Sequence, residues 1–289
     1  GPKVVVQKLS KPLGGVAEMS FGNKPVDGGH LLLTTDEVNG LGLNEDQRDR
    51  FIRRIYGSAE FIRGLERFCL WIEDKHLSDA MQIEPIRKRI DSVRAMRLAS
   101  SKAATVETAD SPSRFGELRQ TGKETVMIVP SVSSESRDNL PCGYAEPRTI
   151  VTNLAFALYD APLWNMALIA SRLHLVWIGT VCGKMKSDFR YSNTLGWNTF
   201  PVPKLTERNK ADLTACAEDI LLTREAHFPA TIADLYDPNT MPEDLRAAHD
   251  RNDETLERIY IGRRFKNDTE RLEKLFDMYT HMTTKVPQQ

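Results

Sequence analysis

Apolar residues recur along this chain in short runs at first and with helical spacing later. Short runs typical of buried strands occur at 31–33, 68–72 and 124–132. Between them, residues 84–100 place apolar side chains at roughly helical intervals, with basic residues available for another face. The pattern over residues 31–203 therefore predicts a mixed α/β (α+β) domain.

Helical spacing dominates in the later part of the chain. Residues 162 to about 185 form the longest stretch with a continuous apolar stripe. Three further helices are predicted at about 206–226, 242–261 and 268–282, the last of them after Asn267, whose spacing to Glu270 resembles a capping box. Residues 204–289 are therefore expected to form a small all-α domain.

Two shorter segments complete the prediction. Asn44 and Gln47 resemble a capping box that opens a helix carrying Phe51, Ile52 and Ile55. Residues 99–122 are rich in Ser, Ala, Thr and Gly, which predicts a long loop. A loop of that length inside a compact domain is more often functional than idle.

Composition and charge exclude few classes of function. The 289 residues are 40% hydrophobic and 27% charged, which is ordinary for a globular protein. Residues 1–204 carry 27 Lys and Arg against 23 Asp and Glu, whereas residues 205–289 carry 12 against 17. A mildly basic body is thus joined to an acidic helical region. The contrast is compatible with nucleic-acid binding by the first part, but it is too small to establish it.

The cysteines and the hydropathy point to a cytoplasmic protein. The four cysteines, Cys69, Cys142, Cys182 and Cys216, are scattered and have no metal-ligand spacing, so we expect reduced thiols and no metal site. No apolar run approaches the roughly 20 residues that span a bilayer, and no membrane partner is expected.

Catalytic motifs are absent from the sequence. There is no Gly-x-Gly-x-x-Gly, Gly-x-x-x-x-Gly-Lys-Ser/Thr, Gly-x-Ser-x-Gly or His-Glu-x-x-His pattern. His174 lies on the apolar stretch and is predicted to be a satisfied core residue. The nearest candidates for a magnesium nuclease, at 73–75 and 123–124, have the wrong spacing. No catalytic residue is predicted.

The segment after the strand at 124–132 carries side chains that can read bases. In an extended chain, Glu135, Arg137 and Asn139 would project from one side. Arginine donates two hydrogen bonds to guanine, glutamate accepts from the amine of cytosine, and asparagine pairs with adenine. The alternative interpretation is an exposed salt bridge between Glu135 and Arg137 in a surface loop.

A basic, aromatic and amide-rich run follows at 184–203. Phosphate contacts set the register of a protein on DNA, whereas a few base contacts specify the sequence. The residues predicted to contact the DNA backbone, in this run and near the long loop, are Arg97, Ser101, Lys102, Lys184, Lys186, Arg190, Tyr191, Ser192 and Asn193.

Four ordered motifs carry a resemblance to a known family. They are Phe21–Gly29, Pro130–Arg137, Arg190–Asn193 with Asn198–Pro201, and Tyr236–Pro238 with Met241–His249. In this order they resemble the C-terminal part of the MmeI-like enzymes. Those are type IIL restriction-modification proteins, single chains that join a nuclease, an adenine-specific DNA methyltransferase and a target recognition domain.

The resemblance implies a domain order. Residues 31–203 would be the DNA target recognition domain and residues 204–289 the family's C-terminal helical domain. Residues 1–30 would be a linker and the join to a methyltransferase domain, with Asn23, Lys24, Asp27 and Gly28 at that join. Gly1 and Pro2 resemble a protease-cleavage scar, which suggests a fragment of a longer protein.

The resemblance also implies a function. It favours Glu135 and Arg137 as base readers over the salt bridge, with Asn139 beside them and a second base contact near Ala103. The partner would be double-stranded DNA, together with the methyltransferase domain of the same parent chain. The parent would use S-adenosylmethionine to methylate adenine, with or without a nuclease, whereas this chain would hold no cofactor and would not be catalytic by itself.

Two other functions stay open at this point. One is a stand-alone hydrolase or nuclease with an unrecognised site, which metal-dependent cleavage by the purified chain would support. The other is a helical protein-interaction module, which would show no salt-sensitive binding to DNA.

Overall fold

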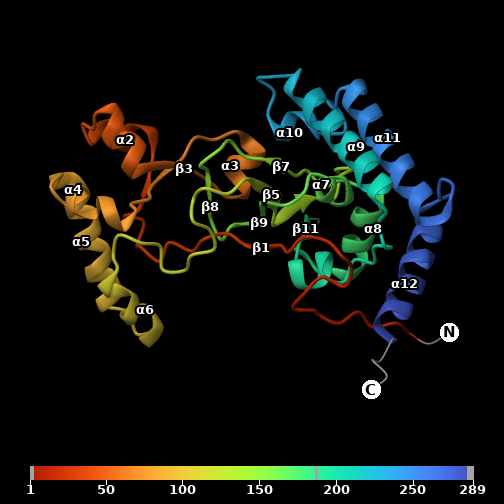
Figure 1. Cartoon of the computed structure of the whole chain (residues 1–289), viewed down its shortest axis with the longest axis horizontal. Coiled ribbons are helices and arrows are strands. Elements are labelled where there is room, and N and C mark those ends of the chain that lie inside the picture. Colours follow the sequence, from red (N-terminus) through yellow and green to blue (C-terminus); the bar gives the residue numbers. More distant parts are fainter. Residues whose placement is uncertain (1–2, 186–187, 285–289) are drawn as a thin grey trace. The chain divides into compact units, whose positions relative to one another are not determined.

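The computed structural model describes residues 3–185 and 188–284 (Figure 1). The chain forms two compact units. The first unit comprises Gly1–Ser20, Met127–Tyr144 and Leu158–Gln289, and the second comprises Phe21–Val126 and Ala145–Ala157. The chain therefore passes between the units several times. The predicted domain boundaries near residues 30 and 203 follow sequence order instead, and they stay a prediction.

A four-stranded sheet organises the second unit. Its strands, in spatial order, are β2 (Leu32–Leu33), β4 (Phe68–Leu70), β3 (Ile52–Tyr56) and β8 (Ile150–Val151). The first three are antiparallel, and β8 adds to β3 in parallel, with Ile55 opposite Ile150. The strands predicted within 31–33 and 68–72 are confirmed.

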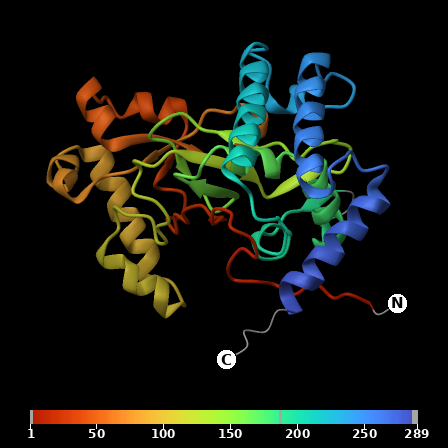
Figure 2. The ribbon, with the colours of Figure 1, turned by 45° about the vertical axis from the view of Figure 1, so that its right-hand side comes forward.

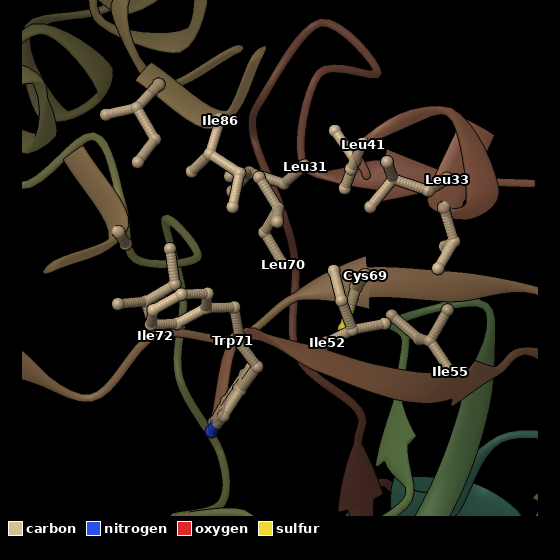
Figure 3. Packing of buried hydrophobic residues seen from close by; sticks show 14 of the residues in the cluster. Leu31, Leu33, Leu41, Ile52, Ile55, Cys69, Leu70, Trp71, Ile72 and Ile86 are labelled. Carbon is tan, nitrogen blue, oxygen red and sulfur yellow. The ribbon is translucent and has the colours of Figure 1, made fainter. Parts of the chain in front are cut away.

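The core of the second unit is a single apolar cluster. Leu31, Leu70 and Ile86 are each fully buried in it, and Figure 3 shows their side chains converging. Trp71 closes one side through an edge-to-face contact with Phe115, with 5.3 Å between ring centroids. Apolar burial from β2, β4 and helix α5 (Glu84–Leu98) therefore holds this unit together.

The helix predicted to carry Phe51, Ile52 and Ile55 is shorter than expected. The capping box is present, since Asn44 accepts from the N–H of Gln47 and Gln47 reaches back to the N–H of Asn44. However, α2 (Glu45–Phe51) ends at Phe51, and the next five residues are strand β3. The sequence Ile-Arg-Arg-Ile-Tyr is β-favouring, and pairing on both edges satisfies its backbone groups.

Short helices surround this sheet. They are α1 (Thr35–Gly40), α3 (Ser58–Arg63), the 3₁₀ turn η1 (Asp74–His76), α4 (Leu77–Met81), α5 (Glu84–Leu98), α6 (Ala103–Glu107) and the 3₁₀ turn η2 (Thr108–Asp110). The helix predicted at 84–100 is confirmed. The predicted loop at 99–122 is wrong in part, because α6 and η2 occupy its first half.

Two sheets contribute to the first unit. It contains most of a four-stranded sheet in the order β1 (Ser20–Phe21), β9 (Ala155–Tyr159), β5 (Val126–Pro130) and β7 (Gly143–Tyr144). A three-stranded sheet has the order β10 (Lys184–Met185), β11 (Asp188–Arg190) and β6 (Val132–Ser134). The predicted strand at 124–132 corresponds to β5, whose five residues are all buried.

The long helix predicted at 162–185 is two helices. α7 (Trp164–Ile169) and α8 (Arg172–Val181) are separated at Ala170 and Ser171. The Ser171 hydroxyl accepts a hydrogen bond from the N–H of His174 at 3.1 Å and so caps α8. Serine favours such a cap over a helix interior, because its side chain competes for backbone groups.

The last part of the chain is helical throughout the described residues. After the π-helical turn η3 (Asn193–Trp197) come α9 (Glu207–Glu225), α10 (Ile232–Leu235), α11 (Glu243–Ile261) and α12 (Asp268–Thr284). Figure 2 shows α9 and α11 side by side. The predicted fold class and the three predicted helices are confirmed, and α10 is an addition. None of the described helices is long and apolar enough to cross a membrane.

A buried carboxylate joins α11 to the start of α8. Asp253 accepts a hydrogen bond from the backbone N–H of Arg172 at 2.8 Å. Burial raises the pKa of the Asp253 carboxyl to about 7, although the Arg172 N–H opposes the rise. Glu257, one turn further along α11, raises this pKa as well. The folded protein therefore holds a proton on Asp253 at pH values where the unfolded chain does not.

We predict that Asp253→Asn makes the thermal midpoint less sensitive to pH. A folded pKa above the unfolded value of about 3.9 means that stability falls as pH rises from about 4 to about 7. Asparagine keeps the carbonyl acceptor for Arg172 but does not titrate. The thermal midpoint of Asp253→Asn minus that of wild type should increase by several degrees between pH 4 and pH 8. Calorimetry with the exposed Asp250→Asn as control checks this, and parallel curves for variant and wild type would contradict it.

Candidate nucleic-acid interface

The structure brings two of the predicted DNA-contacting segments together. Strand β11, from the basic run, pairs antiparallel with β6, from the segment of predicted base readers. Arg190 lies opposite Val132 in this register, and Asp188 lies opposite Ser134. Segments far apart in sequence thus share one small sheet.

The chain turns sharply after β6 instead of staying extended. The N–H of Arg137 donates to the carbonyl of Ser134 at 3.2 Å, and the N–H of Ser136 donates to the Ser134 hydroxyl at 3.3 Å. The prediction that Glu135, Arg137 and Asn139 alternate along one side of a strand is therefore wrong. A serine hydroxyl that bonds the backbone two residues later favours a turn over a strand.

Asn139 is a core residue in the structure. Its side chain is only 6% exposed, and its amide N–H donates to the carbonyl of Ala170 at 3.1 Å. That carbonyl lies at the break between α7 and α8. Asn139 thus anchors the turn to the helices, and its amide N–H is not available to a base in this structure.

Arg137 combines partial burial with unused donors. Its Nη1 donates to the Ser133 hydroxyl at 3.1 Å. In the described part of the chain, no carboxylate lies within ion-pair distance of it. Burial lowers the pKa of the Arg137 guanidinium, and the charges of Asp188 and Asp237 oppose the shift. A guanidinium has five N–H donors, so most of them are available to an acceptor from outside.

Glu135 and Arg137 border the same hollow, of about 370 Å³, whose remaining wall is formed by Asp138 and by residues of α8 and α12. Further charged residues at its edge form ion pairs within the protein. Arg172 pairs with Asp268 at 2.6 Å, and Asp138 pairs with Arg246 at 3.3 Å. The structure therefore brings two of the predicted base readers together and leaves Arg137 without an ion pair.

The neighbouring residues predicted to contact phosphates have varied environments. Arg190 is exposed. Tyr191 is buried, and its hydroxyl lies 2.9 Å from Nε2 of His174. His174 is the core residue that was predicted, but it is not fully satisfied, because its buried Nδ1 has no hydrogen-bond partner among the described residues. The Ser192 hydroxyl caps η3, and the amide of Asn193 donates to the carbonyl of Met19. The side chains of Lys184 and Lys186 lie outside the described part of the structure.

In the second unit, the expected contacts near Ala103 are at the surface. Ser101, Lys102 and Ala103 are exposed at the start of α6, and the N–H of Lys102 donates to the Ser100 hydroxyl at 3.1 Å. A short turn before α6 presents these side chains rather than a long irregular loop.

Arg97 has a structural role in the second unit. Its side chain is fully buried and donates to five backbone carbonyls at 2.6–3.0 Å, those of Pro25, Val26, Thr108, Ser111 and Arg114. These bonds join the 25–26 loop to the segment around η2. The expected phosphate contact by Arg97 is not available in this structure.

The residues predicted at a domain join are divided between interior and surface. Asn23 is fully buried, where it donates to Gln120 and the carbonyl of Val151. The Asp27 carboxylate accepts from the N–H groups of Gly29 and Leu31. Lys24 and Gly28 are exposed. A role of these four positions at a join stays a prediction.

Two buried cysteines have thiols of low reactivity. Burial raises the pKa of Cys142 to about 12 and that of Cys182 to about 11, so both are weakly nucleophilic thiols at neutral pH. Among the described residues, no three His, Cys, Asp or Glu side chains are grouped so that they could hold a metal ion.

Ser133 is a residue of this site that the sequence did not single out. It is 3% exposed and orients the guanidinium of Arg137. The position of Ser133 shortly before Arg137 could have indicated that its hydroxyl binds the guanidinium, but only once the turn at Ser134 is known.

Two family models together match nearly the whole chain. The family model described as the MmeI target recognition domain matches residues 1–204, and the one described as the MmeI C-terminal domain matches residues 205–287. DNA methyltransferase A of Bacillus subtilis (strain 168) is 36% identical over 285 residues, which are 99% of this chain and 32% of the relative. These matches confirm the resemblance found in the four motifs.

A solved structure gives the same result. The structure of the type IIL restriction-modification enzyme MmeI in complex with DNA is similar with a TM-score of 0.91 and 31% sequence identity. The likeness covers 98% of this chain and 38% of that chain. The chain thus spans about a third of the length of the proteins that it matches.

We predict that Arg97→Ala destabilises the protein by about 3 kcal/mol or more, because it leaves five carbonyls without their donor. Chemical unfolding monitored by tryptophan fluorescence measures this loss, and Arg94→Ala on the same helix, with an exposed side chain, is the control. A fully stable Arg97→Ala variant that has lost affinity for every duplex would instead make Arg97 a phosphate contact.

Proposed function

Because the chain belongs to the MmeI family and carries its target recognition and C-terminal domains, we propose that it recognises a specific sequence in duplex DNA. It would be the specificity part of a larger, S-adenosylmethionine-dependent DNA adenine methyltransferase of the cytoplasm. The relative named as a DNA methyltransferase and the DNA-bound MmeI structure support this proposal.

The observation that carries the proposal is the state of Arg137. A partly buried guanidinium loses hydration, and unless it is paired this costs free energy. Among the described residues, the guanidinium of Arg137 has one hydrogen-bond partner, the Ser133 hydroxyl, and Glu135 lies at the edge of the same hollow. The O6 and N7 atoms of guanine match the geometry of the remaining donors, and the partner cytosine offers an amine to glutamate. The pair is therefore suited to one C·G base pair.

Phosphate contacts would come from exposed basic and hydroxyl side chains. Arg190 is exposed on β11, opposite Val132 of β6, and Ser101 and Lys102 are exposed in the second unit, where a second base contact would lie near Ala103. Lys184 and Lys186 join this set on sequence grounds alone. Such contacts would set affinity and register without selecting a sequence.

The glycine-containing loop at 27–29 does not fit S-adenosylmethionine, because the N–H groups of Gly29 and Leu31 already donate to the Asp27 carboxylate. The cofactor would therefore bind elsewhere in the parent enzyme, and the methyltransferase domain would be this chain's protein partner. Lys24 and Gly28 are the exposed positions through which we propose that join.

We predict that Arg137→Ala costs about 1–3 kcal/mol of affinity for the preferred duplex and relaxes one position of it. Selection from a random-duplex pool at low salt, followed by sequencing of the retained DNA, measures both effects. Wild type should enrich a short motif with a C·G pair that the variant no longer selects. Equal losses on matched and mismatched duplexes would remove Arg137 as a base reader.

Two further variants separate specificity from general affinity. Arg190→Ala should weaken binding to all sequences alike and make it less dependent on salt. Arg258→Ala removes an exposed ion pair with Glu254 within α11 and should leave binding unchanged. If wild type retains no duplex even within its longer parent, the proposed function is wrong.

A further inference from the structure

The turn with the proposed base readers is held at several points. We define the reading loop as residues 135–142, between β6 and β7. Asn139 fastens its middle to the carbonyl of Ala170. Two further side-chain attachments of the loop come from the helical C-terminal region, which is remote in sequence and acidic overall.

The first of these attachments is next to Arg137. Nη1 of Arg246, on α11, lies 3.3 Å from the carboxylate of Asp138. The same side chain reaches the carbonyl of Pro238 through Nη2 at 3.4 Å. Arg246 thus connects the reading loop to the turn between α10 and α11. Asp237, in that turn, also places a negative charge near Arg137.

The second attachment is at the end of the reading loop. Nη1 of Arg224, on α9, donates to the carbonyl of Cys142 at 2.5 Å. Its guanidinium also lies over the ring of Tyr236, at 5.8 Å from the centroid, and the hydroxyl of Tyr236 lies 2.7 Å from Nε2 of buried His249. Arg224 is therefore itself oriented by packed aromatic groups.

Gly143 makes this approach possible. A Cβ at position 143 would collide with the guanidinium of Arg224. The backbone of the loop and the arginine are therefore in close contact, which limits how far the end of the loop can move.

From these contacts we propose that the helical C-terminal region is part of the sequence-reading site, with Arg224 and Arg246 as positioning residues for Glu135 and Arg137. The inference rests on the proposed function. A bidentate contact to a base requires its donors to be held within about 0.5 Å and 10–20°. Neither arginine needs to touch DNA, because each acts through the loop.

The test measures loop order and sequence discrimination on the same proteins. Hydrogen exchange of peptides covering 132–144 reports the loop, since the N–H groups of Ser136 and Arg137 are bonded only when the turn is formed. The ratio of affinities for the selected duplex and for a duplex changed at the C·G pair reports discrimination. The variants are Arg246→Ala and Arg224→Met, with Arg246→Lys and Arg224→Lys as conservative partners and Arg258→Ala as control.

For Arg246→Ala we expect exchange in the loop to be about 2- to 5-fold faster and the affinity ratio to fall by a similar factor, as for an exposed ion pair. Arg224→Met should have the larger effect, about 10-fold, because it removes a charged donor from a carbonyl. The lysine variants should recover most of both readouts, and the control should match wild type.

Three outcomes would overturn the inference. Loop exchange could be unchanged in Arg246→Ala and Arg224→Met, or exchange could rise while the affinity ratio is kept. Wild type could also lack discrimination altogether, in which case the proposed function fails as well. Because exchange needs no DNA, it distinguishes a loop that the arginines do not hold from a chain that does not read sequence.

Discussion

The break between α7 and α8 is the constraint on which the first unit depends. A helix end leaves backbone groups without partners, and inside a protein each of them must be satisfied by another group. Here the carbonyl of Ala170 accepts from Asn139, the N–H of Arg172 donates to Asp253, and the carbonyl of Ala167 accepts from Asn252. One irregularity in the chain thus fastens the reading loop and α11 to the same point.

Arg97 and Arg137 show how burial and acceptor supply decide what an arginine does. Arg97 is fully buried, but five carbonyls surround it, so its charge is solvated by the protein. Arg137 is partly buried with one hydroxyl as its partner. The guanidinium donors of Arg97 are used on backbone carbonyls within the protein, whereas we propose that donors of Arg137 bind an acceptor on the DNA.

The acidic helical region has a role that its charge alone would not suggest. Its net charge makes it a poor surface for DNA. Its arginines at 224 and 246 instead point to the backbone and the carboxylate of the reading loop. We propose that these basic residues within an acidic region serve DNA recognition indirectly, by fixing the reading loop.

The elements with local signals could be predicted from the sequence alone. Helix α5 and the helices α9, α11 and α12 follow from periodicity, the capping box at Asn44 follows from residue spacing, and the family follows from four ordered motifs. The sequence also identified Glu135 and Arg137 as candidates, although it placed them on a strand. These features could be predicted because each depends on side chains a few residues apart.

The remaining features depend on contacts between residues that are far apart in the sequence. Residues 52–56 form a strand because β4 and β8 pair with its two edges. The helix is interrupted at Ser171 because distant side chains satisfy the backbone carbonyl and N–H groups that the interruption exposes. Arg97 and Asn139 were predicted from the sequence to contact DNA, yet their side chains donate hydrogen bonds to backbone carbonyls that are remote along the chain. The pairing of Asp138 with Arg246 likewise joins residues 108 positions apart. Contacts of this range have no local pattern, because the partners meet only when the chain has folded.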